Sequence, residues 1–112
     1  MISSPSPSAG RTGCGIVRVV PGRAELLVVL AGEIDTDVRD ALDAAVVAAA
    51  AADLPVHVDC TQVTYCGAEG LRLLVRLRDV CALRGLELSA SRCVRDLLTM
   101  CGVEIRMRAW SG

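Results

Sequence analysis

The chain has 112 residues, of which 53% are hydrophobic and 22% are charged, and its formal net charge at pH 7 is −1. This length allows one domain with a substantial core, and the composition argues against a disordered chain and against direct binding to nucleic acid. Because no apolar run approaches a membrane span and residues 1–13 lack the features of a signal peptide, we expect a cytoplasmic protein that does not insert into a membrane.

The N-terminal half predicts a tail, two strands and a helix. Residues 1–13 are rich in Ser, Pro and Gly and are expected to form a disordered tail. Ile16–Val20 is predicted to be a strand, and the almost wholly apolar residues 25–31 indicate a buried central strand. Thr36 is a good helix N-cap, and we expect the helix that follows it to run to about Asp53.

The C-terminal half alternates strands and helices. Residues 56–60 alternate as a strand and lead into a loop at 61–66. The next helix is predicted to begin near Gly67 or Ala68 and to end before Gly85, which is a typical residue after a helix end. A short strand at 86–89, a helix at 92–101 capped by Ser91 and a last strand at 103–109 complete the pattern.

The predicted element order is β-β-α-β-α-β-α-β within one domain, residues 14–112. An opening pair of strands followed by alternating helices and strands predicts an α/β fold with a mixed sheet and helices packed on it. With no Phe, one Trp and one Tyr, the core is expected to be aliphatic.

The sequence offers little for catalysis or metal binding. Six cysteines are present without a CxxC pair, and most are expected to be reduced, buried apolar residues. His57, the one histidine, lies on an alternating strand, where a packed role is commoner than a ligand role. The acidic residues from Glu33 to Asp43 are accompanied by no nucleophile, second histidine or phosphate loop. We expect no metal, no cofactor and no enzymatic activity.

Three segments, in order, resemble the STAS domains (sulfate transporter and anti-sigma factor antagonist). Residues 30–35, Leu-Ala-Gly-Glu-Ile-Asp, are similar to the family's strand that ends before its first helix. Residues 56–74 contain a strand, a loop and then Gly70-Leu71 near the start of a helix. Residues 94–103 are similar to the third helix of the family, which ends at a Gly followed by a hydrophobic residue. The resemblance covers roughly residues 14–110 and implies a STAS-like fold.

The resemblance also implies a function and a site. Bacterial members antagonise an anti-sigma factor, a kinase of the histidine-kinase-like ATPase fold, and so free a sigma factor. The implied partner-binding surface joins the loop after the second strand to the start of the second helix, and comprises Glu33, Asp35, Thr36, Tyr65, Cys66, Ala68 and Glu69. The alternative implied by the family is a STAS subunit of a transporter ATPase complex or of a signalling scaffold.

The chain departs from the family at the phosphorylation switch. The family's kinases phosphorylate a Ser within Asp-Ser-Ser-Gly-Leu or a close variant, and aligning on Gly70 places Ala68 at that Ser. Because alanine has no hydroxyl, the switch is expected to be absent. Glu69 is interpreted either as an ordinary first-turn helix residue or as a partial mimic of the phosphate. Cys66 is interpreted either as a packed residue or as a redox substitute for the switch.

Overall fold

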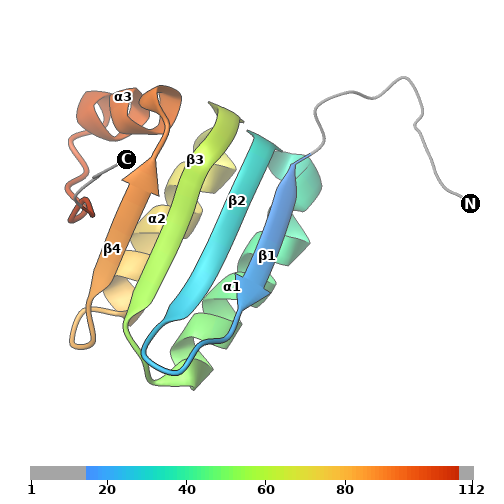
Figure 1. Cartoon of the computed structure of the whole chain (residues 1–112). Helices are drawn as coiled ribbons and strands as arrows, with labels where there is room; N and C mark the ends of the chain where they lie inside the picture. Colours follow the sequence, from blue (N-terminus) through green and yellow to red (C-terminus); the bar gives the residue numbers. More distant parts are fainter. Residues whose placement is uncertain (1–14, 109–112) are drawn as a thin grey trace, which may run out of the picture.

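The computed structural model describes residues 15–108 as a four-stranded sheet with three α-helices (Figure 1). The predicted tail at 1–13 lies outside the described residues. The elements, in chain order, are β1 Ile16–Val20, β2 Leu26–Ile34, the short 3-10 helix Thr36–Val38, α1 Arg39–Ala52, β3 Val56–Cys66, α2 Ala68–Val80, β4 Leu86–Ala90 and α3 Arg92–Met100.

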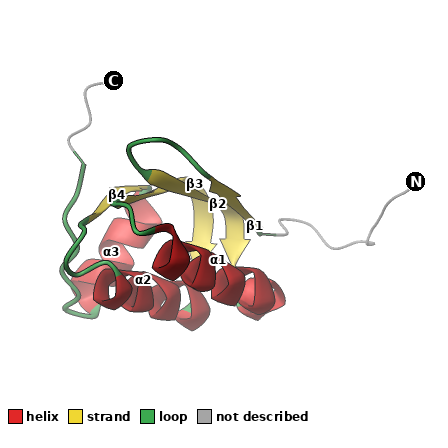
Figure 2. Cartoon of the chain, turned by 90° about the horizontal axis from the view of Figure 1, so that it is seen from below, coloured by secondary structure: helices red, strands yellow, loops and turns green. Residues whose placement is uncertain are grey.

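The sheet is mixed, as predicted, and its strands lie in the order β1-β2-β3-β4. β1 pairs with β2 antiparallel, whereas β2, β3 and β4 run parallel to one another. Helices α1 and α2 lie side by side on one face of the sheet, and α3 lies beyond the end of β4 (Figures 1 and 2). The opposite face of the sheet, called the open face below, is not covered by α1 or α2.

The core lies between the sheet and the two helices and is aliphatic, as predicted. Alternate residues of β2 and β3 point into it, and no polar or charged side chain of residues 15–108 is fully buried. The helices contribute the faces that their spacing predicts. The buried apolar helix residues are Leu42, Ala45, Val46 and Ala49 of α1, Leu73, Leu74 and Leu77 of α2, Val94 and Leu98 of α3, and Cys81 just after α2. Burying each large aliphatic side chain contributes about 1.5–3 kcal/mol.

Two predicted boundaries next to the candidate site are wrong. The loop predicted at 61–66 is the second half of β3, because Val63 is buried and the end of β2 provides a hydrogen-bonding partner. Thr36 does not cap the first helix. Asp35 precedes a 3-10 turn, where its carbonyl accepts a bond from Val38 N at 3.1 Å, and α1 begins only at Arg39.

The helix that begins at Ala68 ends before Gly85, as predicted. α2 stops at Val80, and a turn follows in which Gly85 N donates to Cys81 O at 2.8 Å. Gly85 has a φ of 104°, a conformation that favours glycine. The turn lets the chain reverse into β4.

The strand predicted at 103–109 is not formed within the described residues. Only one bridge remains, between Met107 and Leu88 of β4, flanked by two hydrogen bonds of 2.9 Å. Val103 and Ile105 pack against the core as predicted, but Met107 is 43% exposed. The segment is therefore attached to the sheet edge at one point instead of along a full ladder.

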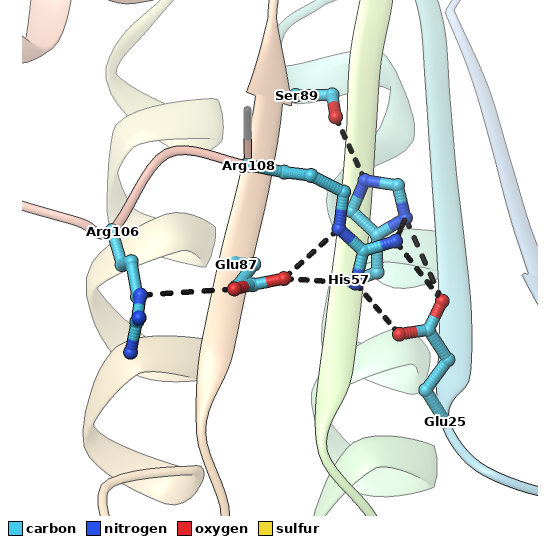
Figure 3. A network of polar contacts seen from close by, with 6 residues as sticks. All are labelled: Glu25, His57, Glu87, Ser89, Arg106 and Arg108. Atoms are coloured by element: carbon cyan, nitrogen blue, oxygen red, sulfur yellow. Dashed lines mark hydrogen bonds and ion pairs between the residues drawn. The ribbon is translucent and has the colours of Figure 1, made fainter. Parts of the chain in front are cut away.

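A polar network on the open face holds this segment (Figure 3). The Arg108 guanidinium donates to Glu25 Oε1 at 2.7 Å, to Glu87 Oε1 at 2.9 Å and to His57 Nδ1 at 3.1 Å. His57 Nε2 lies 2.8 Å from Ser89 Oγ. Because Nδ1 accepts from an arginine, we assign the ring the neutral form with its proton on Nε2. His57 is thus a packed residue, in agreement with the sequence interpretation.

Candidate functional site

The ends of the two central strands bring the predicted site residues together. β2 and β3 run parallel, and their last residues pair Glu33 with Tyr65 and Ile34 with Cys66. Gly67 N donates to Ile34 O at 2.9 Å, which ties the start of α2 to the end of β2. The loop from Asp35 and the first turn of α2 therefore lie next to each other. Site residues far apart in the sequence form one region at this edge of the sheet.

Asp35 and Tyr65 flank the residue that precedes α2. A Cβ atom added to Gly67 would lie 3.2 Å from Asp35 Oδ1 and 3.3 Å from the Tyr65 hydroxyl oxygen. The φ of Gly67 is −91°, so its backbone does not require glycine and crowding is the reason for its small size. Tyr65 is 51% exposed, and tyrosine is one of the residue types enriched at protein interfaces.

Ala68 is the first residue of α2 and its side chain is exposed. It stands where the resemblance puts the phosphorylated serine, on the same edge as Asp35. A methyl group there offers no oxygen to a kinase. The side chain of Ala68 is accessible but cannot be phosphorylated.

Glu69 points toward arginines and not toward open solvent. Its side chain is only 16% exposed, and its carboxylate lies 3.6 Å from Arg39 of α1 and 3.4 Å from Arg72 of α2. Two cations so close compensate its negative charge. This geometry favours the structural interpretation of Glu69, a link between the two helices, over the mimic of a phosphate.

Gly70 allows α2 to approach the strand ends closely. An added Cβ would overlap Cys66 Sγ and would lie 3.1 Å from Ile34 Cγ2. The Gly of the Gly-Leu pair is thus required by packing. It sets the depth at which the first turn of α2 sits against β2 and β3.

Cys66 lies in surroundings that keep its thiol protonated. Burial, with a smaller contribution from Cys93, raises the pKa of Cys66 to about 11. The sequence interpretation relied on a helix N-terminus to lower this pKa, but desolvation has the larger effect here. Cys66 is therefore a packing residue in this structure, and its thiol is not activated.

The acidic run is only partly a free surface. Asp43 lies 2.7 Å from Arg76 of α2, so it links the helices, whereas Glu33, Asp35 and Asp40 are exposed. Thr36 is also exposed, in the 3-10 turn. The exposed carboxylates that adjoin the start of α2 are hence those of the loop after β2.

Sequence reasoning missed the arginines of the site. The Glu69–Arg72 pair has i,i+3 spacing and was accessible from the sequence. The Arg39–Glu69 and Asp43–Arg76 pairs join two helices, and no spacing within either helix predicts them. Within residues 15–108 no group of three or more His, Cys, Asp or Glu side chains could hold a metal ion.

The family follows from comparison with known proteins. A family model described as "Mlab, STAS domain" matches residues 17–108. The chain belongs to the STAS domain family. No curated protein sequence matches this STAS domain significantly. None of the helices in its described part is long and apolar enough to cross a membrane.

Solved structures agree with this assignment. An anti-sigma factor antagonist from Mycobacterium paratuberculosis is similar with a TM-score of 0.73 at 19% identity, over 90% of this chain and 91% of that chain. The anti-sigma factor antagonist SpoIIAA in its unphosphorylated form is similar with a TM-score of 0.66 at 17% identity, over 86% of this chain and 90% of that chain. At such identities the likeness concerns the fold, which is that of the anti-sigma factor antagonists.

Proposed function

We propose that this STAS domain is a cytoplasmic, non-enzymatic anti-sigma factor antagonist that binds an anti-sigma factor of the histidine-kinase-like ATPase fold. The proposed contact surface consists of Glu33, Asp35, Thr36, Tyr65, Cys66, Ala68 and Glu69. The protein is further proposed to escape phosphorylation at the start of α2. Its binding would then be governed by the amounts of the two proteins instead of by a phosphate.

One observation carries the proposal. The exposed loop carboxylate of Asp35 lies against Gly67, immediately before the exposed methyl group of Ala68. The resemblance assigns the partner contact to this edge, and Ala68 supplies no hydroxyl that a kinase could modify. The Asp that precedes the phosphorylated Ser in the family is replaced as well, by Gly67. A phosphate at the position of Ala68 would add about −1.5 to −2 charges beside Asp35, which explains why its absence favours constant binding.

Substitution of Asp35 tests the contact surface. Asp35→Ala is expected to weaken binding to the cognate anti-sigma factor by about 1–3 kcal/mol, the usual cost of removing a charged interface contact. Asp79→Ala is the matched control, because Asp79 is also exposed but lies near the other end of α2. Isothermal titration of both variants measures the difference. Equal affinities in the two variants would exclude Asp35 from the surface.

Substitution of Ala68 tests the missing switch. With the anti-sigma factor and ATP, the unchanged chain is expected to gain no phosphate at the start of α2, whereas Ala68→Ser is expected to be phosphorylated and to lose affinity. Mass spectrometry of peptides, which locates any phosphate, and titration give both readouts. A phosphate on Thr61, Thr64 or Tyr65 of the unchanged chain would contradict the proposal. Gly67→Asp is a poor companion change, since its side chain would crowd Asp35 and Tyr65.

A further inference from the structure

A cavity of about 450 Å³ lies where β4 leads into α3, and its lining includes none of the residues of the proposed partner surface. Its walls come from β3, the end of β4, the first turns of α3 and the segment that carries Met107 and Arg108. The volume falls within the ~300–1,000 Å³ of small-molecule sites. The cavity also lies at the carboxyl end of a parallel strand, where open α/β sheets commonly bind ligands.

Small side chains leave this space open. β4 ends in Ser89 and Ala90, Ser91 follows, and all three line the cavity. The chain then departs into α3 and returns to β4 only at the bridge between Leu88 and Met107. Because the bridge is single, no further strand residues cover the end of β4 in the described part of the chain. The cavity is thus a consequence of the incomplete fifth strand.

The lining combines apolar surface with one uncompensated cation. Ala90 and the 43% exposed Met107 provide apolar walls. Arg108 is already paired with Glu25 and Glu87. The Arg95 guanidinium, by contrast, has no ion pair or hydrogen bond within residues 15–108, and it lines the cavity from α3. Arg92, one turn earlier, is paired with Asp96 and is not among the lining residues.

The Ser91 hydroxyl adds a second polar group. Its side chain does not cap α3, and its one hydrogen-bonding contact among residues 15–108 is a 3.4 Å approach to the weakly bonding thiol of Cys93. Ser91 and Arg95 are four residues apart, so they lie on the same side of the helix start. The cavity is also lined by the polar residues Thr61, Gln62 and Ser89. A hydroxyl and a guanidinium on one side of a cavity with the apolar side chains of Ala90 and Met107 suit a ligand with an anionic end and an apolar body.

We propose that this cavity is a binding site for a small organic anion. The anionic group, a carboxylate, sulfonate or phosphate ester, is bound by Arg95 and Ser91, and the apolar body contacts Ala90 and Met107. The site is distinct from the proposed anti-sigma factor contact, because none of its lining residues belongs to that surface, although β3 contributes to both. The proposal therefore stands or fails separately from the proposed function.

Fluorescence titration of the full chain with anilinonaphthalene sulfonate tests the site. We expect saturable binding at one site, competed by octanoate and much less by octanol, which has the same apolar body without the charge. Arg95→Gln is expected to weaken binding of the probe about tenfold, the loss of a charge-assisted contact. Arg92→Gln, the matched control on the same helix, is expected to change it less than about twofold, as for a charge outside the site.

A second variant removes the apolar wall without touching the cation. Met107→Gln replaces the apolar side chain by an uncharged polar one at an exposed position of the lining and is expected to weaken binding of both the probe and octanoate. Circular dichroism of each variant verifies that the fold is retained. Three outcomes would overturn the proposal: no saturable binding, equal affinities in Arg95→Gln and Arg92→Gln, or equal competition by octanol and octanoate.

Discussion

Replacing Arg108 by Met removes the cation at the centre of the open-face network. The guanidinium contacts the side chains of Glu25, Glu87 and His57 at 2.7, 2.9 and 3.1 Å. In Arg108→Met the two carboxylates keep their places without a shared cation between them. His57 Nδ1 also loses its donor, so each of these three groups loses one partner (Figure 3).

The size of the effect follows from the exposure of these groups. The Arg108 side chain is 36% exposed, and those of its two glutamate partners are 37% and 35% exposed. Solvent screening therefore lowers the stabilisation from each contact. It falls well below the ~1.5–3 kcal/mol of a buried charged hydrogen bond, toward the ~0.2–1 kcal/mol of a surface pair. Summed over three contacts, we expect a loss of about 2 kcal/mol in unfolding free energy. For a domain of this size that lowers Tm by about 8–16 °C.

Thermal unfolding followed by circular dichroism at neutral pH measures this loss. Arg106→Met is the matched control, because Arg106 is 80% exposed and has one 3.7 Å pair with Glu87. We expect the control to change stability by less than about 0.5 kcal/mol. Equal Tm values for the two variants would refute the reasoning, and would mean that the network does not stabilise the C-terminal segment.

Three other predictions concern pH, packing and thiols. Burial and the nearby Arg108 lower the pKa of His57 from its usual 6.5, so the unfolded chain takes up the proton first. Urea unfolding should therefore show stability falling as the pH drops below about 6.5, and His57→Gln should flatten that part of the profile. Gly70→Ala should lower the unfolding free energy by about 1–3 kcal/mol because its Cβ overlaps Cys66, and the ~1 kcal/mol helix preference of alanine partly offsets this loss. Urea unfolding should show a smaller loss when the same substitution is made in a Cys66→Ala background. In a Cys14→Ser variant, peptide mass spectrometry after brief treatment with a thiol reagent at pH 7 should find the exposed Cys101 labelled well before Cys66.

Periodicity was sufficient to predict most of the fold. The stripe of Leu73, Leu74 and Leu77 is buried as its helical spacing indicates, and the run at 25–31 lies in a central strand. The ends of strands were harder to predict where pairing with a strand distant in the sequence determines them. The residues after Cys60 have no clear alternation, and they extend β3 because the end of β2 lies beside them.

The segment after α3 and the ion pairs of the site could not be predicted from local sequence patterns. Val103 to Met107 alternates as a strand would, but the Arg108 network and one bridge fix this segment, and the glutamates involved lie far away in the sequence. The order of the motifs predicts that the loop after β2 and the start of α2 are adjacent, as they are. The pairing of Glu69 with Arg39 does not follow from that order, since it depends on how two helices pack. Burial of Cys66 was likewise invisible before the helix was placed.

Release of a sigma factor tests the central claim most directly. A preformed complex of the cognate anti-sigma factor and a labelled sigma factor is titrated with this STAS domain, with and without ATP, and free sigma factor is followed by fluorescence anisotropy. We predict complete release at near-stoichiometric amounts and the same curve after prolonged incubation with ATP, because Ala68 cannot be phosphorylated. Absence of release in both conditions would contradict the antagonist function and favour a STAS subunit of a transporter or scaffold. Release that is lost over time with ATP would contradict the missing switch.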